Sequence, residues 1–146
     1  MRVYLVHHAD AVSPMTDSQR PLSARGLAQA ASLADRAKAA GCVPAAIWHS
    51  GKLRSRQTAE AFYRACNPMA EFKMILGVRP DDPPQHVREL LIGESRDVLM
   101  VGHMPSIPEI LCTLTHSAKR DFPLNGMVAL EPDGEWWKEI WRLTSH

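Results

Sequence analysis

The sequence has few cysteines, and none of them has the C-x-x-C spacing of a metal or redox site. Cys42, Cys66 and Cys112 make an odd number, which fits neither a paired disulfide framework nor a cysteine zinc site. We therefore expect a reduced, cytoplasmic setting. The first residues, Met1 to Val6, form only a short apolar run, unlike the longer apolar core of a signal peptide.

The chain also lacks an excess of charge of either sign. Its 146 residues include 17 Lys and Arg against 16 Asp and Glu, which gives a formal net charge of +1. This balance argues against a nucleic-acid partner, since such binding requires a strongly basic surface. No apolar run approaches the roughly 18 residues of a membrane span, so we expect no membrane association. The length suits one domain over residues 1–146.

Histidine, by contrast, is abundant, with seven copies in the chain. Imidazole is the side chain that most often carries out chemistry near neutral pH, because its ordinary pKa lies close to that range. The positions of these histidines relative to strands and helices therefore decide which of them are candidates for a site.

Short apolar runs alternate with helical patterns along most of the chain. We expect strands at 3–6, 45–48, 72–78 and 98–101, and helices at 24–40, 54–66, 87–92 and 107–115. Ser23 is the expected N-cap of the first helix, and residues 127–143 are typical of a β-hairpin with its turn at 132–135. This order predicts an α/β fold, a three-layer α/β/α sandwich with a mostly parallel central sheet and a C-terminal β-hairpin.

Three of the expected strands are followed at once by histidine. His7 and His8 follow the first strand, His49 the second, and His103 comes two residues after the run at 98–101. In open α/β sheets, ligands bind beyond the carboxyl ends of the strands. We therefore expect these imidazoles to lie around a common crevice.

Two of these strand ends also have features that suit an anion. Ser50, Lys52 and Arg54 lie just before or within the start of the second helix, and His103 precedes another helix. Helix N-termini offer free N–H groups, and an arginine fork matches phosphate oxygens. A phosphate is the favoured ligand. Because the chain has no Gly-x-x-x-x-Gly-Lys loop, a protein nucleophile such as a neutral imidazole is the expected agent of phosphate chemistry.

The strand-end residues belong to longer motifs that resemble a known family. The motifs are LVHHADA at 5–11, RPLS at 20–23 with Gly26, WHSGKLRSRQTAE at 48–60 and VGHMP at 101–105. In order and spacing the chain resembles the histidine phosphatase superfamily, most closely its small branch of phosphohistidine phosphatases related to SixA. The resemblance implies a phosphoglycerate mutase-like fold and covers nearly the whole chain.

The resemblance implies a role for each matching residue. His8 is the nucleophile, which forms a transient phosphohistidine that water hydrolyses. Arg54 and His103 bind the phosphoryl oxygens, with Arg20 and Ser50 near the pocket. No metal or cofactor is implied. The substrate is a phosphorylated protein, with phosphohistidine favoured, or a small phosphoester, because a short chain has little room for the lid insertions that enclose larger substrates. We expect a monomer.

The first motif departs from the family pattern. Where the family has Arg-His-Gly, this chain has His7, His8 and Ala9. An imidazole has fewer donors than a guanidinium and is charged only part of the time near neutral pH, so phosphate binding is expected to be weaker and more pH-dependent. The alternative function is a catalytically weakened module that binds phosphate or a phosphoprotein. Lys52 or Arg56 would compensate in part if either points inward.

The general acid is assigned by position only. Larger relatives use a carboxylate in the middle of the chain, and Asp82 is the candidate here, with Asp81 beside it and Glu94 ranked lower. A phosphohistidine substrate needs the acid less, because imidazole leaves more readily than an alkoxide.

A metal site is a further alternative, built from the four histidines at strand ends. Imidazole is a common zinc ligand. Adjacent residues on a strand point to opposite faces, which makes His7 and His8 an unfavourable pair of ligands for one ion. We expect His49 to be structural, and Trp136, Trp137 and Trp141 to pack the hairpin against a helix. The remaining histidines, His86, His116 and His146, are expected on the surface.

Overall fold

Six strands form one sheet in the computed structural model of the chain, which describes residues 1–13, 16–118 and 121–145. The strands are β1 (Val3–His7), β2 (Ala46–His49), β3 (Glu71–Met74), β4 (Val98–Gly102), β5 (Met127–Asp133) and β6 (Trp136–Leu143). Their order across the sheet is β3-β2-β4-β1-β5-β6. The strands β1 to β4 run parallel to one another, whereas β5 is antiparallel to both β1 and β6.

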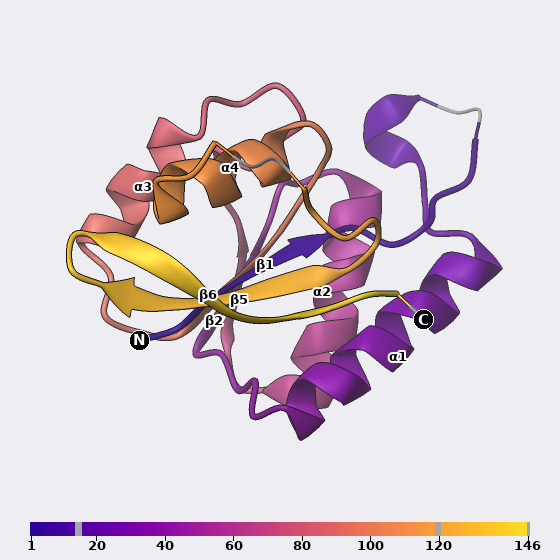
Figure 1. The fold of residues 1–146 in the computed structure, drawn as a ribbon. Coiled ribbons are helices and arrows are strands. Elements are labelled where there is room, and N and C mark those ends of the chain that lie inside the picture. Colours follow the sequence, from indigo (N-terminus) through magenta and orange to yellow (C-terminus); the bar gives the residue numbers. More distant parts are fainter. Residues whose placement is uncertain (14–15, 119–120, 146) are drawn as a thin grey trace.

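Helices cover both faces of this sheet (Figure 1). The helices are α1 (Ala24–Ala39), α2 (Leu53–Cys66), α3 (Gln85–Ile92) and α4 (Ser106–Thr115), with a short 3-10 turn η1 (Asp17–Gln19). The pair α1 and α2 packs on one face, and the pair α3 and α4 on the other. The predicted three-layer α/β/α sandwich, with a mostly parallel sheet and a C-terminal hairpin, is confirmed.

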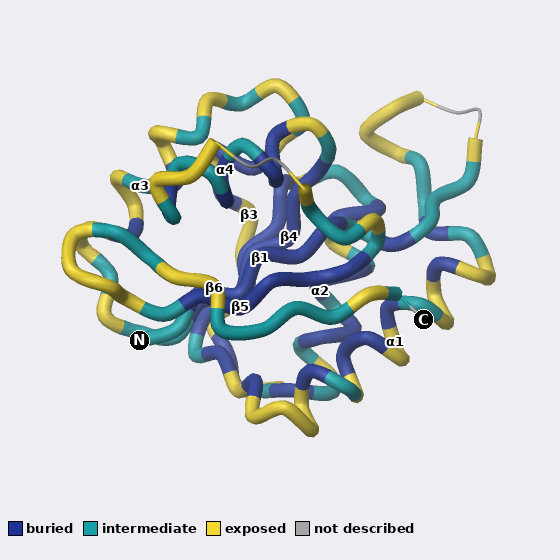
Figure 2. The backbone as a smooth tube through the Cα atoms, in the orientation of Figure 1, coloured by how far each residue is buried: buried dark blue, intermediate teal, exposed yellow. Residues whose placement is uncertain are grey.

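The central strands lie between two hydrophobic clusters. Every residue of β1, β2 and β4 is buried, and Figure 2 shows these strands as the dark centre of the molecule. Side chains alternate between the two faces, so that Tyr4 and Val6 pack toward α1 and α2 while Val3 and Leu5 pack toward α3 and α4. This is why these strands appear in the sequence as uninterrupted apolar runs.

The cap of α1 agrees with the sequence-based expectation, whereas the ends of β3 and β5 differ from it. Ser23 is the N-cap of α1, because its Oγ accepts a hydrogen bond from the Gly26 N–H at 3.0 Å. The strand β3 ends at Met74 instead of residue 78, since the chain turns at Gly77, whose φ of +110° is outside the extended region. The hairpin turn is also tighter than expected, because β5 continues to Asp133.

No helix within the described part of the chain has the length and apolar character needed to cross a membrane.

Candidate active site

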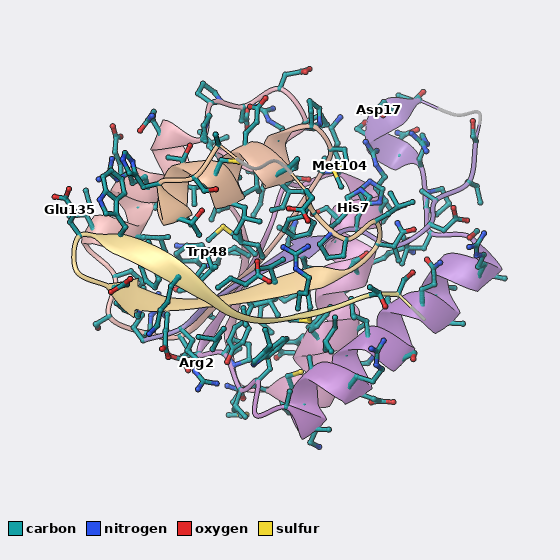
Figure 3. All side chains as sticks on the ribbon, in the orientation of Figure 1. Arg2, His7, Asp17, Trp48, Met104 and Glu135 are labelled. Carbon is teal, nitrogen blue, oxygen red and sulfur yellow. The ribbon has the colours of Figure 1, made fainter. Side chains whose placement is uncertain are left out.

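The candidate site lies at the carboxyl edge of the parallel strands. His7 is the last residue of β1, with Gly102 of β4 as its partner in the sheet, and His8 and His103 follow these two residues. The ring centroids of His7 and His8 are 4.5 Å apart, and those of His8 and His103 are 4.9 Å apart. Figure 3 shows His7, Met104 and Asp17 at this end of the molecule, with Glu135 at the other. The expected convergence of imidazoles is thus present.

The proximity of the His7 and His8 rings corrects one step of the sequence argument. The strand β1 ends at His7, so the alternation of side chains between faces does not extend to His8. The His8 N–H still donates to the Gly102 carbonyl oxygen at 3.1 Å, but the His8 ring lies beside the rings of both His7 and His103. Nevertheless, the described residues contain no group of three or more His, Cys, Asp or Glu that could hold a metal ion.

His8 has a defined tautomer. Its Nδ1 lies 2.7 Å from the carbonyl oxygen of Ala9, and a carbonyl oxygen can only accept a hydrogen bond. The proton therefore sits on Nδ1, which leaves the lone pair on Nε2. The main chain that holds the ring is itself anchored, because the Ala9 N–H donates to Thr58 Oγ1 at 3.0 Å. His8 thus presents a neutral imidazole with a free nucleophilic nitrogen.

His7 has the opposite tautomer. Its Nδ1 accepts a hydrogen bond from the backbone N–H of Asn125 at 2.8 Å, so its own proton sits on Nε2. Asn125 also donates from its side-chain amide to the carbonyl oxygen of His8, again at 2.8 Å. Sequence reasoning missed Asn125. The only local signal was an Asn-Gly pair, which marks a turn with positive φ, and nothing in the sequence connects it to a strand more than 100 residues away.

His103 is bonded through Nε2 to the hydroxyl of Ser50, at 2.6 Å. The same hydroxyl accepts from the Lys52 N–H at 3.3 Å. The other ring nitrogen of His103, Nδ1, is buried and has no hydrogen-bond partner in the described part of the chain. Ser50 therefore orients the His103 ring through Nε2.

Burial keeps all three imidazoles neutral. It lowers the pKa of His7 to about 3, that of His8 to about 4 and that of His103 to about 2, from an ordinary value of 6.5. The positive charge of Arg54 contributes in the same direction for each ring. A ring with this pKa stays neutral near neutral pH, whereas the weaker and more pH-dependent phosphate binding expected for His7 stays a prediction.

The positive charge of the site comes from three other side chains. Arg54, in the first turn of α2, is buried, and Arg20 and Lys52 lie beside it. All three pair with the carboxylate of Asp17: Arg54 Nη2 at 3.2 Å, Arg20 Nη1 at 3.7 Å, and Lys52 Nζ in the closest contact. The hydrogen bond from Lys52 is the largest of the effects that lower the pKa of Asp17. The single carboxylate of Asp17 thus faces three cations, and Arg54 Nε is buried without a partner in the described residues.

The two residues suggested as compensating cations therefore differ. Lys52 points toward the site through its contact with Asp17. Arg56 is exposed and pairs with Glu60 along α2 at 3.6 Å, so it does not contribute positive charge to the crevice.

Asp82 lies beside the site, on a cavity of about 520 Å³ that is also lined by Asp17 and Lys52. Its Oδ2 accepts from the N–H groups of Gly77 and Arg79, both at 3.0 Å. These bonds hold the loop before α3, and Arg79 Nε pairs with the same oxygen at 3.5 Å. Glu94 is bonded instead to Arg96 at 2.8 Å.

The other histidines and the tryptophans lie outside this cluster. His49 Nδ1 accepts from the Gly51 N–H at 3.0 Å, and its ring lies against Phe72. His86 and His116 are exposed, and His146 lies outside the described residues. Trp137 and Trp141 pack against the two hydrophobic clusters. Trp136 stacks on the His116 ring, with centroids 4.2 Å apart.

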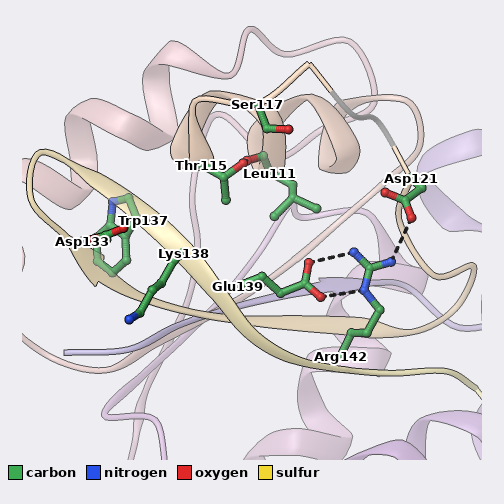
Figure 4. A pocket seen from close by; sticks show the side chains of 9 residues that line it. All are labelled: Leu111, Thr115, Ser117, Asp121, Asp133, Trp137, Lys138, Glu139 and Arg142. Carbon is green, nitrogen blue, oxygen red and sulfur yellow. Dashed lines mark hydrogen bonds and ion pairs between the residues drawn. The ribbon is translucent and has the colours of Figure 1, made fainter.

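A cavity of about 630 Å³ lies between α4 and the hairpin (Figure 4) and contains none of the predicted site residues. Its most prominent charge, Arg142, is bonded to Glu139 at 2.7 Å and lies 3.4 Å from Asp121. The guanidinium is thus already neutralised, which leaves the histidine cluster as the better candidate for an anion site.

Comparisons with known proteins identify similar sequences and structures. Residues 3–75 match the family model described as the histidine phosphatase superfamily (branch 1). A solved structure of the protein histidine phosphatase SixA with tungstate is 21% identical, covers 99% of this chain and 97% of its own, and has a TM-score of 0.90. A protein from Agrobacterium tumefaciens assigned as the phosphohistidine phosphatase SixA is 27% identical, covers 98% of this chain and 97% of its own, and has a TM-score of 0.83.

A more distant match shares the fold. A phosphoserine phosphatase from Entamoeba histolytica is 14% identical, with a TM-score of 0.75 and coverage of 99% of this chain and 98% of its own. The curated proteins contain no match to this sequence.

Proposed function

This chain belongs to the histidine phosphatase superfamily, and we propose that it is a metal-independent phosphatase that acts through a phosphohistidine intermediate on His8. The observation that carries the proposal is the tautomer of His8. Its Nδ1 proton is held by the Ala9 carbonyl, so that the lone pair of Nε2 faces a crevice lined by His103 and the Arg54 cation.

The proposed reaction has two steps. In the first, His8 Nε2 attacks phosphorus, the bond from phosphorus to the leaving group breaks, and the leaving group takes a proton from Asp82 or from solvent water. In the second, water attacks the phosphorus of phospho-His8 and gives up a proton to the group that donated one in the first step, the N–P bond breaks, and the bond electrons return to Nε2 as phosphate departs. The first step needs a neutral imidazole, and burial supplies one by lowering the pKa of His8 to about 4.

The charge of the transferred phosphoryl group is balanced by fixed donors. A loose phosphoryl transition state spreads charge over three equatorial oxygens and is stabilised mainly by positioned positive groups. Arg54, Arg20 and the N–H groups of His103 and His7 supply these donors. Two of them, Arg54 Nε and His103 Nδ1, are buried polar atoms without a partner in the described residues, and a bound phosphoryl group would satisfy such atoms.

The favoured substrate is phosphohistidine on a protein, with small phosphoesters as the alternative. Asp82 would protonate the leaving group of an ester from the wall of the neighbouring cavity. An imidazole leaving group needs this proton less. The structural neighbours described as SixA support the same choice. We further propose that the enzyme is a cytoplasmic monomer that needs no cofactor.

A weakened binding module is the second candidate function. The observation that favours it is that His7, at the position of the family's arginine, is neutral and contributes no charge to the site. A binding module would hold phosphate or a phosphoprotein at the same residues without turnover.

The two functions are separated by an assay of turnover. We expect the protein to hydrolyse a phosphohistidine peptide and a generic aryl phosphate in the presence of a chelator, and we expect His8→Gln to abolish both activities. His86→Gln, which changes an exposed histidine on α3, is the matched control. Stoichiometric phosphopeptide binding without hydrolysis would instead establish the binding module, and activity retained in His8→Gln would refute the nucleophile.

A further inference from the structure

The loop before β5 is fitted closely to the end of β1. The N–H of His7 donates to the carbonyl oxygen of Gly126 at 2.9 Å, and the Gly126 N–H donates back to Pro123 at 2.9 Å. A Cβ on Gly126 would lie 2.4 Å from the carbonyl oxygen of Leu143. Asn125 has a φ of +53°, a conformation that asparagine tolerates better than most residues. The shape of this loop, and hence the direction of its N–H groups, is set by these contacts.

This loop directs one backbone donor at His7. The N–H of Asn125 lies 2.8 Å from His7 Nδ1, and a backbone N–H can only donate. The side chain at position 7 must therefore provide an acceptor at this point, or the N–H loses its partner in a partly buried environment. Leaving such a donor unsatisfied costs about 1–3 kcal/mol in proteins.

We propose that His7 serves the phosphate site as an uncharged donor through its Nε2–H, and that Asn125 is the positioning residue that fixes this tautomer. The proposal rests on the proposed function, because it assigns the second nitrogen of His7 to the phosphoryl group. In the described part of the chain Nε2 has no hydrogen-bond partner, whereas Nδ1 is occupied. Nδ1 of His7 thus accepts from the Asn125 N–H, and Nε2–H is left to donate to the phosphoryl group.

Histidine at position 7 offers a hydrogen-bond acceptor that the family's arginine lacks. A guanidinium has five donors and no acceptor, so an arginine would place a donor against the Asn125 N–H. It would also bring another positive charge near Arg54. The loop and the histidine are therefore matched, and simple restoration of the family's arginine is expected to harm the site.

The neutral donor does not depend on pH near neutrality. The titratable groups that face His7 are His8, His103 and Arg54. None of these supplies a carboxylate that would favour a protonated His7 ring. The unliganded His7 ring should therefore stay neutral between about pH 5 and 8.

Two substitutions at position 7 distinguish the acceptor role of Nδ1 from the donor role of Nε2. In His7→Asn the side-chain oxygen takes the approximate place of Nδ1 and can accept from Asn125, but the donor at the place of Nε2 is lost. In His7→Gln the amide nitrogen approximates Nε2, but the acceptor for Asn125 is lost. The readouts are the dissociation constants of inorganic phosphate and tungstate by calorimetry, and the midpoint of thermal unfolding.

We expect His7→Asn to keep the unfolding midpoint near that of the parent and to weaken anion binding about tenfold, which is about 1.4 kcal/mol. We expect His7→Gln to lower the unfolding midpoint while retaining more of the anion affinity. His7→Arg should lower the midpoint without tightening binding. Unchanged anion binding in His7→Asn, or tighter binding in His7→Arg at an unchanged midpoint, would overturn the proposal.

An independent readout is the tautomer itself. In ¹⁵N NMR of the labelled protein, His7 should show a protonated Nε2 and a bare Nδ1 across this pH range. Asn125→Gly keeps the backbone N–H and tolerates positive φ, so it should keep this signature. A His7 ring that titrates near its ordinary pKa, or that carries its proton on Nδ1, would refute the proposal. These measurements need no turnover, so a failure of the phosphatase function would appear separately as anion binding without hydrolysis.

Discussion

His8 should remain an unprotonated nucleophile far below the pH at which an ordinary histidine gains its charge. Burial is the main cause that lowers its pKa from 6.5 to about 4; the charges of Arg54 and Arg20 act in the same direction, whereas the hydrogen bond to Ala9 and the charge of Asp10 oppose it. This change corresponds to about 3 kcal/mol between the two protonation states. At about pH 5.5 an ordinary imidazole is roughly nine-tenths protonated, whereas His8 should be almost entirely neutral.

The assay is an NMR titration of the His8 ring, assigned by comparison with His8→Gln. The control is the same chain in denaturant, where histidines titrate near 6.5. The acid limb of kcat/KM for a phosphohistidine peptide is the functional counterpart, once the ionisation of the substrate has been corrected for. A His8 midpoint near 6.5 in the folded protein would refute the claim that burial sets the protonation of the nucleophile.

The same pKa has a consequence for stability with a definite sign. Because the folded pKa is lower than the unfolded one, the unfolded chain binds more protons as the pH falls, and stability decreases between pH 6.5 and about 4. At pH 5 the loss from His8 alone is about 2 kcal/mol. Urea unfolding at pH 7 and pH 5 should show a smaller loss in His8→Gln than in the parent, and equal losses would contradict the assignment.

Three further predictions concern phosphate binding, proton transfer and packing. Arg54→Lys keeps the charge but loses the fork, so kcat/KM should fall at least about tenfold; unchanged steady-state kinetics would exclude Arg54 from the site. Asp82→Asn should lower hydrolysis of an alkyl phosphate, which releases an alkoxide, about a hundredfold and that of a phosphohistidine peptide only about twofold; equal losses would indicate that Asp82 only holds its loop. Gly26→Ala places a Cβ 1.9 Å from the carbonyl oxygen of Asp10 and should destabilise the fold by about 2 kcal/mol or more in urea unfolding. Gly93→Ala, with no atom within 4 Å of the new Cβ, is its control, and equal stability of the two variants would contradict the packing argument.

The fold was predictable because its signals are local. The strands β1, β2 and β4 are buried on both faces, so each appears in the sequence as a short apolar run. The edge strand β3 was predicted too long, because Ile75 and Val78 are apolar residues that are buried beyond the end of the strand. Apolar pattern alone does not distinguish a strand residue from a buried loop residue.

The arrangement of the candidate site was predictable where residues follow strands directly, whereas its function stays a prediction. The topology brings His7, His8 and His103 to one edge, as parallel strands require. Asn125 could not be found in this way, since its role depends on a positive φ and on contacts with a distant strand. The pairing of Asp17 with three cations was hidden for the same reason, because a loop residue has no periodic pattern that shows where its side chain points.

The most direct test of the account is to trap the phosphorylated enzyme. The protein would be mixed rapidly with a phosphorylated substrate, quenched in alkali to preserve a phosphoramidate, digested and analysed by mass spectrometry, with His8→Gln treated in parallel. The account predicts a phosphoryl group on His8 that forms and decays at rates consistent with turnover and that is absent from the variant. Turnover without any phosphoryl-enzyme, or a phosphoryl group on another residue, would contradict it.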